Sequence, residues 1–255
     1  GKGTLDANTT GTKNNALGNY ALSTNTTGAN NVAIGHESLV NSTTASNNVA
    51  IGHTALFANT TGGANTALGS LALDANTTAD GNTAIGANAA SGTTTGNSNT
   101  AVGQNALYAN TIGTMNAVLG NHALDANISG SYNVALGGYS LSANTTAANN
   151  TAVGYAALTA NTTGTGNASV GSNALDANTT GAYNVAFGMS ALGANTTAGS
   201  NVAIGVSALE FNTTGANNTA VGTSSLDANT TASNNTALGQ GSLGANTTGA
   251  SNTAV

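Results

Sequence analysis

The feature that most constrains this chain is a strict repeat of 17 residues. Glycine occurs at Gly1, Gly18 and Gly35 and then at every seventeenth residue as far as Gly239, with no insertion or deletion. Fifteen copies fill residues 1–255, so no part of the chain lies outside the repeat. A fixed period of this kind is typical of architectures that stack one structural unit on the next. The sequence therefore predicts one continuous array over residues 1–255 rather than separate globular domains.

Most of the 17 positions admit one residue type or a few similar ones. Counting the glycine as position 1, the copies share the consensus G-x-x-[AS]-L-x-A-N-T-T-[GA]-x-x-N-[TV]-A-[VIL]. Position 5 is Leu except at Ala90, and position 8 is Asn except at Ser42 and Thr93. Position 14 never varies, and we expect its side chains to form a structural ladder along the stack. The members of this ladder are Asn14, Asn31, Asn48, Asn65, Asn82, Asn99, Asn116, Asn133, Asn150, Asn167, Asn184, Asn201, Asn218, Asn235 and Asn252.

The repeat length and the residue types predict an all-β fold. Seventeen residues are too few for a helix-pair repeat, which needs about 33 or more. Positions 14–17, for example residues 31–34, contain β-branched residues and predict a short strand. Positions 4–7, for example residues 21–24, predict a second strand. Glycine at position 1 is never replaced by alanine, which indicates positive φ or a close backbone approach. We therefore expect a β-solenoid (a parallel β-roll) of fifteen 17-residue coils, with strands stacked about 4.8 Å apart.

The alternation of side chains along a strand then predicts which positions face inward. We expect Leu at position 5 and the residues at positions 7, 15 and 17 to line the coil interior, while the variable position 6 faces solvent. Positions 14 and 16 would then point outward, yet they are almost uniformly Asn and Ala. Because a face open to water would vary, this Asn/Ala wall is predicted to be buried against another chain. Several copies around an axis, most simply three, would bury it, so the fold is expected to be trimeric or polymeric.

The array is expected to lack caps. Val255 completes a copy, and a further copy would start with glycine. The bare ends of a solenoid expose unpaired strand edges and tend to polymerise. We therefore expect either an array that continues within a longer fibre or subunits that stack head to tail. At one coil per repeat, the fifteen coils would form a rod about 70 Å long.

The composition excludes several classes of function. Lys2 and Lys13 are the only basic residues besides three histidines, so the chain lacks the cations of a phosphate-binding surface, and no nucleic-acid partner is expected. There is no cysteine, and therefore no disulfide or thiolate metal site. No apolar run approaches the roughly 18 residues of a membrane helix, so no membrane contact is expected within this segment.

Residues 150–157, NTAVGYAA, carry the pattern N-[TV]-A-[VIL]-G-x-x-[AS], which most repeats follow. This pattern resembles the head repeats of trimeric autotransporter adhesins, which read S-V-A-I-G-x-x-A-x-A-x-G over a shorter period. The resemblance implies a left-handed parallel β-roll that trimerises on the bacterial surface. The repeats are also similar to N-T-A-V-G-x-x-A-L-x-x-N-T-T-G arrays in predicted tail fibres of bacteriophages and in large surface proteins of aquatic bacteria. The chain differs from the adhesin heads in its turn, where L-x-A-N-T-T-[GA] replaces a shorter A-x-G.

Positions 8–10 offer two candidate kinds of surface. Asn-Thr-Thr, as at residues 8–10 and 161–163, fits the N-glycosylation sequon, but it equally fits a ladder in which each asparagine bonds its equivalents above and below. We favour the ladder, because glycans at every coil would crowd one another. The threonines of position 9 form a regular column that could order water and bind ice. A role in the turn is favoured, because a flat ice-binding face needs two parallel columns.

Three further groups of residues were considered for chemistry. His36 and His53 occupy position 2 of neighbouring copies and could share a metal ion with Glu37, although exposed surface histidines are the favoured interpretation. The aspartates of position 6 lie at least three copies apart, too far for paired catalysis or a shared ion, and they fit a solvated surface. The aromatic residues fit either contact with a glycan or cover for the Ala-rich wall. The aspartates are Asp6, Asp74, Asp125, Asp176 and Asp227, and the aromatic residues are Tyr20, Phe57, Tyr108, Tyr139 and Tyr155.

These observations predict a structural protein and not an enzyme. No catalytic residue, cofactor or metal site is expected. The favoured interpretation is a segment of an extracellular fibre at a cell surface or on a virion tail, of the adhesin or tail-fibre type. Its expected partners are copies of itself, as a homotrimer or a head-to-tail polymer, and a surface glycan or host receptor. The alternative is a β-solenoid module that binds ice or glycans.

Overall fold

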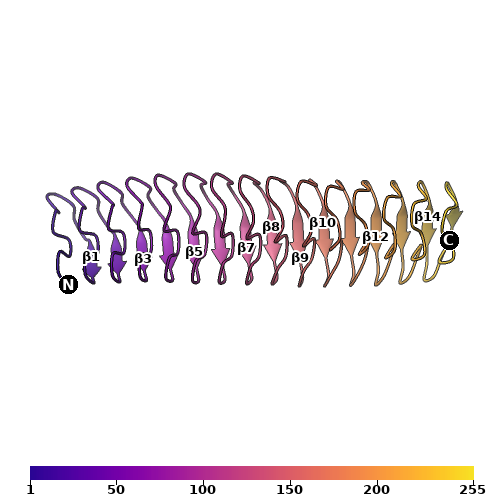
Figure 1. Ribbon diagram of the computed structural model, residues 1–255, viewed down its shortest axis with the longest axis horizontal. Coiled ribbons are helices and arrows are strands. Elements are labelled where there is room, and N and C mark those ends of the chain that lie inside the picture. Colours follow the sequence, from indigo (N-terminus) through magenta and orange to yellow (C-terminus); the bar gives the residue numbers. More distant parts are fainter. The chain divides into compact units, whose positions relative to one another are not determined.

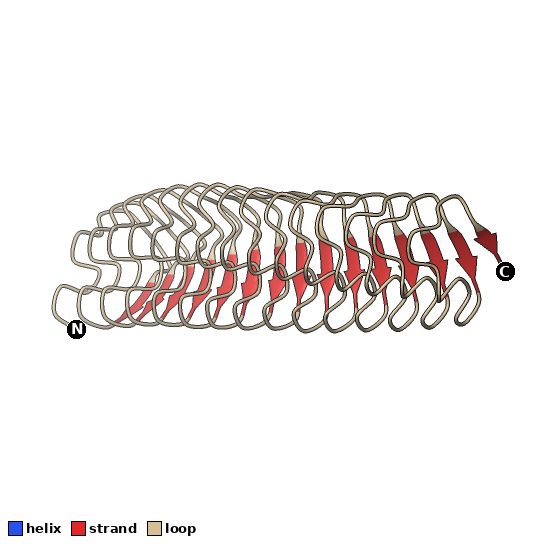
Figure 2. Ribbon diagram, turned by 45° about the vertical axis from the view of Figure 1, so that its right-hand side comes forward, coloured by secondary structure: helices blue, strands red, loops and turns tan.

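The computed structural model describes residues 1–255 and contains strands, turns and bends but no helix. Each repeat contributes one short strand near its end, and turn segments form the rest of each coil (Figure 2). The strands are labelled in Figure 1 and are β1 (Asn15–Leu17), β2 (Val32–Ile34), β3 (Val49–Ile51), β4 (Thr66–Leu68), β5 (Thr83–Ile85), β6 (Thr100–Val102), β7 (Ala117–Leu119), β8 (Val134–Leu136), β9 (Thr151–Val153), β10 (Ala168–Val170), β11 (Val185–Phe187), β12 (Val202–Ile204), β13 (Thr219–Val221), β14 (Thr236–Leu238) and β15 (Thr253–Ala254).

The chain divides into two compact units, residues 1–130 and residues 131–255. Strands β1 to β7 belong to the first unit and β8 to β15 to the second. Within each unit, consecutive strands pair in parallel, and each residue lies opposite the residue 17 places later, as in Ala33↔Ala50 and Ala203↔Ala220. The predicted all-β β-solenoid is therefore confirmed.

The second strand predicted at positions 4–7 is wrong, because these residues form a turn. Positions 3 and 5 have a left-handed backbone in every coil; in the second coil, φ is 58° at Tyr20 and 53° at Leu22. A β-strand needs negative φ, so this backbone cannot be one. The left-handed conformation costs a non-glycine residue roughly 1–2 kcal/mol. Full burial of a leucine such as Leu22 contributes about 1.5–3 kcal/mol, which offsets that cost.

The interior of each coil is lined by positions 4, 5, 8, 11, 14 and 16, which are buried through most of each unit. Leucine at position 5 is the only large apolar side chain among them, and the others are Ala, Ser, Gly or Asn in almost every copy. The coil is therefore thin, and half of its interior positions depend on small residues. In the second coil, the interior residues are Ala21, Leu22, Asn25, Gly28, Asn31 and Ala33.

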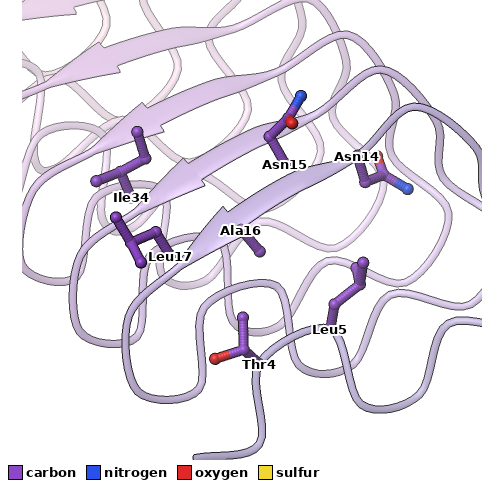
Figure 3. Close-up of a pocket in the computed structure, with 7 residues that line it drawn as sticks. All are labelled: Thr4, Leu5, Asn14, Asn15, Ala16, Leu17 and Ile34. Atoms are coloured by element: carbon purple, nitrogen blue, oxygen red, sulfur yellow. The ribbon is translucent and has the colours of Figure 1, made fainter. Parts of the chain in front are cut away.

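The predicted assignment of faces is also wrong along the strand. Positions 14 and 16 point into their own coil, where Asn31 and Ala33 are fully buried without a second chain. Positions 15 and 17 point outward instead, and Figure 3 shows Leu17 and Ile34 side by side on that outer side. Period two was correct but its phase was reversed: the small side chains of positions 14 and 16 fill the interior of the thin coil, and the larger side chains of position 17 lie outside. The uniformity of Asn and Ala therefore reflects the interior of one chain and is no evidence for a second.

In the turn, position 5 is buried as predicted, but position 4 is buried as well, and position 7, which was predicted to face inward, is half-buried or exposed. Position 1 behaves as predicted. Gly35 has φ of 133°, and a Cβ on it would collide with the carbonyl oxygen of Gly52 in the next coil. Position 11 has no positive φ, and Ala45 is buried there with 2% exposure, so small size is the requirement at this position.

Candidate functional site

The asparagines of position 14 connect each coil to the next through their side chains. The backbone N–H of Asn31 donates to Oδ1 of Asn14 in the preceding coil over 2.9 Å. The Nδ2 of Asn31 donates to the carbonyl oxygen of Ala45 in the following coil over 2.8 Å. In the second unit, Asn201 makes the same two bonds to Asn184 and Gly215. Each side chain thus satisfies one buried backbone donor and one buried backbone acceptor of the next coil, which explains why no other residue type occupies this position.

The asparagines of position 8 form a second ladder, made of direct bonds between side chains. The Nδ2 of Asn76 donates to Oδ1 of Asn59 over 2.8 Å and to the carbonyl oxygen of Ala79 in its own turn over 3.2 Å. These side chains are fully buried in both units, away from the end coils. The nitrogen that a glycan would occupy is therefore enclosed and engaged in two hydrogen bonds, which favours the ladder over the sequon.

The two substitutions at position 8 interrupt this ladder. Ser42 is too short to reach its neighbour, so its Oγ and the Oδ1 of Asn25 are both buried without a hydrogen-bond partner. Thr93 follows Asn76 in the ladder, and the Oδ1 of Asn76 is likewise buried without a partner. Each interruption leaves polar atoms unsatisfied within an otherwise closed network, and such atoms destabilise a fold.

The threonines of position 9 also bond along the stack. The Oγ1 of Thr26 donates to the carbonyl oxygen of Thr43 in the next coil over 3.0 Å, and Thr162 donates to Thr179 over the same distance. The same carbonyl of Thr43 accepts the backbone N–H groups of Thr26 and Thr27. Because the hydroxyl hydrogens are used inside the protein, this column is part of the turn and not a free array of donors.

Positions 15 and 17 of successive coils form what we call the outer strand face. Position 15 is mainly Thr or Val, and position 17 is always Val, Ile, Leu or Phe. The side chain of Leu17 is 66% exposed and that of Phe187 is 56% exposed. Continuous apolar surface of this kind marks an interaction site in soluble proteins. The position-17 residues are Leu17, Ile34, Ile51, Leu68, Ile85, Val102 and Leu119 in the first unit, and Leu136, Val153, Val170, Phe187, Ile204, Val221, Leu238 and Val255 in the second.

Positions 3 and 6 of successive coils line what we call the turn groove. In the first unit, the groove widens into a pocket of about 280 Å³ lined by Asn88, Asn105, Tyr108, His122 and Asp125. Nδ2 of Asn88 donates to Oδ1 of Asn105 over 3.0 Å, and Nδ2 of Asn105 lies 3.2 Å from Nε2 of His122. The Nδ1 of His122 lies 2.8 Å from Oδ2 of Asp125. These contacts hold the four side chains of Asn88, Asn105, His122 and Asp125, from three consecutive coils, in one polar cluster beside Tyr108.

A pocket of about 300 Å³ occupies the turn groove of the second unit. Its lining includes Asn173, Asp176, Gly193, Glu210 and Phe211. Gly193 stands at position 6 and has no side chain, so the groove is open between the carboxyl groups of Asp176 and Glu210. Burial raises the pKa of Asp176 above its usual value, and hydrogen bonds from backbone groups of Asp176 and Ala177 oppose this.

His36 and His53 do lie together, as their shared position indicates. Their rings stack with centroids 5.4 Å apart and planes 9° from parallel, and Nδ1 of His36 is 3.8 Å from a carboxyl oxygen of Glu37. No group of three or more His, Cys, Asp or Glu side chains in the structure could hold a metal ion. The geometry is that of two stacked surface rings.

Some tyrosines cover a glycine of the preceding coil. A Cβ on Gly3 would lie 2.8 Å from the ring of Tyr20, and a Cβ on Gly166 would lie 2.8 Å from the ring of Tyr183. Tyr139 and Tyr155 meet edge to face with ring centroids 6.0 Å apart. These rings therefore pack along the stack; they do not cover the Ala-rich wall, which lies inside each coil.

A further pocket, of about 540 Å³, lies at the first coil (Figure 3). It is lined by Thr4, Leu5, Asn14, Asn15, Ala16, Leu17 and Ile34. Most of these occupy positions that are interior in the other coils, so this pocket adds no new chemistry.

Comparisons of the chain with protein-family models, with curated proteins and with solved structures find no match. The structure also contains no helix with the length and apolarity needed to cross a membrane.

Two surfaces were missed by the sequence reasoning. Positions 15 and 17, which were predicted to be interior, form the outer strand face instead, where the side chains of position 17 are exposed or half-buried. The turn groove was missed because positions 3 and 6 were read separately. Its signal was the run of polar residues at position 3 in consecutive copies, Asn88, Asn105 and His122.

Proposed function

We propose that this chain is a structural, non-enzymatic segment of an extracellular fibre of the adhesin or tail-fibre type. In this proposal, copies of the chain associate through their outer strand faces, most simply as a trimer. The resemblance of every repeat to adhesin heads and tail-fibre arrays supports an extracellular location, at a cell surface or on a virion tail.

The observation that carries the proposal is the exposed row of Val, Ile, Leu and Phe at position 17. Burial of apolar surface contributes roughly 25 cal/mol per Å², and each coil adds another such side chain to the same face. The outer strand face repeats at every coil, so the surface that covers it best has the same spacing between side chains. A second copy of this chain has that spacing. Closed symmetric assemblies are the commonest way to bury such a face.

The mechanical role follows from the ladders. Within each unit, consecutive coils are joined by strand pairing, by the asparagines of position 14 and the threonines of position 9, and by the asparagines of position 8 except at Ser42 and Thr93. Interactions that recur at every coil resist bending and local opening, as expected of a stiff spacer. Subunits could also join head to tail, which would lengthen the fibre without changing the lateral contact.

The test is the mass of the native assembly by light scattering, for the wild-type chain and for an Ile85→Lys, Val102→Lys variant. Both substitutions place a charge on the outer strand face of the first unit without touching the coil interior. We expect a trimer for the wild type and a lower mass for the variant, with an unchanged β-sheet circular dichroism spectrum. An Ile112→Lys variant is the matched control, because Ile112 is 56% exposed but lies at position 10, off this face. A wild-type chain that stays monomeric at high concentration contradicts the proposal, as does an assembly that the double variant leaves intact.

A further inference from the structure

We infer that the turn groove carries recognition sites for neutral sugars, one in each unit, at the pockets around Tyr108 and Phe211. Each site would take a hexopyranose ring or the end of a neutral oligosaccharide. This inference goes beyond the fibre role and does not depend on it, because a single chain already forms both pockets.

The first pocket is pre-organised by hydrogen bonds that run along position 3. The Nδ2 of Asn105 can only donate, so Nε2 of His122 accepts, and Nδ1 of His122 carries the proton that it donates to Oδ2 of Asp125. The Oδ1 of Asn105 is occupied by the amide of Asn88. The side chains are therefore held in one arrangement before any ligand binds, which lowers the entropic cost of binding.

These bonds leave two acceptors of the cluster unused, both on side chains that line the pocket. They are Oδ1 of Asp125 and Oδ1 of Asn88, at opposite ends of the cluster. A sugar hydroxyl that donates to a carboxylate oxygen forms a charge-assisted bond, which is about twice as strong as a neutral one. The ring of Tyr108 is 46% exposed beside them and offers an apolar surface with a phenol at its tip. An amide, a carboxylate and an aromatic ring together suit a molecule with hydroxyl groups around its edge and C–H groups on its face.

The second pocket repeats this combination with different residues. Asn173 supplies the amide, Asp176 and Glu210 supply carboxylates, and Phe211, which is 54% exposed, supplies the ring. Gly193 makes the space between the two carboxylates. The two units thus provide the same three kinds of group from different residues. In the other coils, position 3 or position 6 more often carries Ala, Val, Leu, Ser or Thr, so this combination is less common there.

The charges exclude acidic sugars. The only lysines of the chain are Lys2 and Lys13, and neither lines either pocket. A uronic or sialic acid would therefore meet Asp125, or Asp176 and Glu210, with no cation to offset the repulsion. Each pocket is near the lower limit of small-molecule sites, so we expect a single sugar ring per site and weak, millimolar binding.

The test uses the full chain and methyl hexosides, with binding followed by saturation-transfer NMR. The variant Tyr108→Ser, Phe211→Ala removes both rings, using residue types that other copies already carry at these positions, as in Ser142 and Ala160. We expect its affinity to fall at least about tenfold, the change that accompanies the loss of roughly 1.4 kcal/mol. Tyr155→Ser is the matched control, since it removes an exposed ring outside both pockets and should bind as the wild type does.

Four results overturn the inference. They are no binding of neutral hexosides by the wild type, equal binding by the ring-free variant, an equal loss in the Tyr155→Ser control, and binding of acidic sugars in preference to neutral ones. An Asn105→Ala, Glu210→Ser variant, which keeps both rings, checks the polar half of each site and should also bind more weakly. Circular dichroism confirms that every variant keeps the fold. Loss of self-association with sugar binding retained would refute the proposed fibre and leave this inference standing.

Discussion

The backbone N–H of Asn65 donates to Oδ1 of Asn48, one coil earlier, over 2.9 Å. The same amide group also donates, through Nδ2 of Asn48, to the carbonyl oxygen of Gly62 over 3.0 Å, so position 14 needs a side chain that accepts and donates at this reach. An aspartate would lack the donor, and a leucine would lack both groups. The N–H of Asn65 and the carbonyl oxygen of Gly62 are both backbone groups of the following coil. Just before each strand begins, the side chain at position 14 therefore makes the bonds between coils that backbone pairing makes within the strand.

Asn48→Ala is therefore expected to destabilise the chain by about 2–4 kcal/mol, because the N–H of Asn65 becomes a buried donor without a partner and a small cavity forms. The denaturation midpoint in guanidinium chloride measures this. Asn30→Ala is the control: Asn30 is exposed at position 13, where Ala64 already has the same left-handed backbone, so its effect should stay within about 0.5 kcal/mol. Equal effects of the two substitutions would show that the buried ladder is not what stabilises the stack.

Ser42→Asn should stabilise the first unit. An asparagine at this position 8 can donate to Oδ1 of Asn25, which is now buried without a partner, and it also removes the unpaired Oγ of Ser42. The expected gain is about 1–2 kcal/mol, read from the same denaturation midpoint. Ser70→Asn serves as the control, since position 2 is exposed and already holds Asn19 in another copy. A loss of stability in Ser42→Asn would mean that the ladder cannot close there.

Gly35→Ala should disrupt the stack more than any surface change. The added Cβ would collide with the carbonyl oxygen of Gly52, and φ of 133° is strained for alanine. We expect a loss of at least about 3 kcal/mol, or local opening that hydrogen exchange detects around residues 35 and 52. Gly63→Ala provides the comparison, because position 12 holds Ala29 in another copy and the nearest atom to the new Cβ is the Ser46 carbonyl oxygen at 3.1 Å. If both substitutions have the same small effect, the coils can separate at position 1 without cost.

The stability of the chain should also depend on the charge of Asp74. Burial raises the pKa of this carboxyl above 3.8, while hydrogen bonds from Ser91 and from the backbone groups of Asp74 and Ala75 oppose the rise. Because the folded state holds the proton more tightly than the unfolded state, the contribution of Asp74 to stability rises as pH falls through its raised pKa and becomes constant below 3.8.

Asp74→Ser should therefore stabilise the chain slightly at neutral pH and lose this advantage as pH falls toward 3.8. Thermal melts across this range measure the difference, with the exposed Asp6→Ser as the control. A difference between Asp74→Ser and wild type that does not change with pH would contradict this account of the carboxyl group.

The sequence was sufficient to predict the strand at the end of each copy and parallel stacking at a step of 17 residues, although it also predicted a second strand at positions 4–7 that the structure does not contain. These follow from a period that no chain could keep by chance and from the β-branched residues before each glycine. The sequence did not predict which side chains of the strand point into the coil. Alternation along a strand assigns its residues to two faces, but it does not say which face is interior. Ala33 and Ile34 show the difficulty: hydrophobicity alone would bury the isoleucine, but Ala33 is fully buried and Ile34 is 38% exposed.

The turn was harder to predict for a different reason. Leu22 has φ of 53°, a value that local preferences assign to glycine or asparagine, and it is held there by burial and by the bond from its N–H to the carbonyl oxygen of Ser38. The turn groove depends on this backbone, since positions 3 and 6 meet along the stack only when the chain folds back between them. No residue pattern in a single copy could have revealed Asn88, Asn105 and His122 as neighbours of Tyr108 and Asp125.

The pairing of Ala33 with Ala50, and of every strand residue with its equivalent in the next repeat, has a genetic consequence. If one whole 17-residue segment were lost or duplicated within a unit, the flanking coils would close on one another with the same types of contact. Unequal recombination between near-identical segments could then change the reach of the molecule in whole steps while leaving it able to fold. The irregular residues, such as Ser42 and Thr93, would be the marks by which such events could be traced.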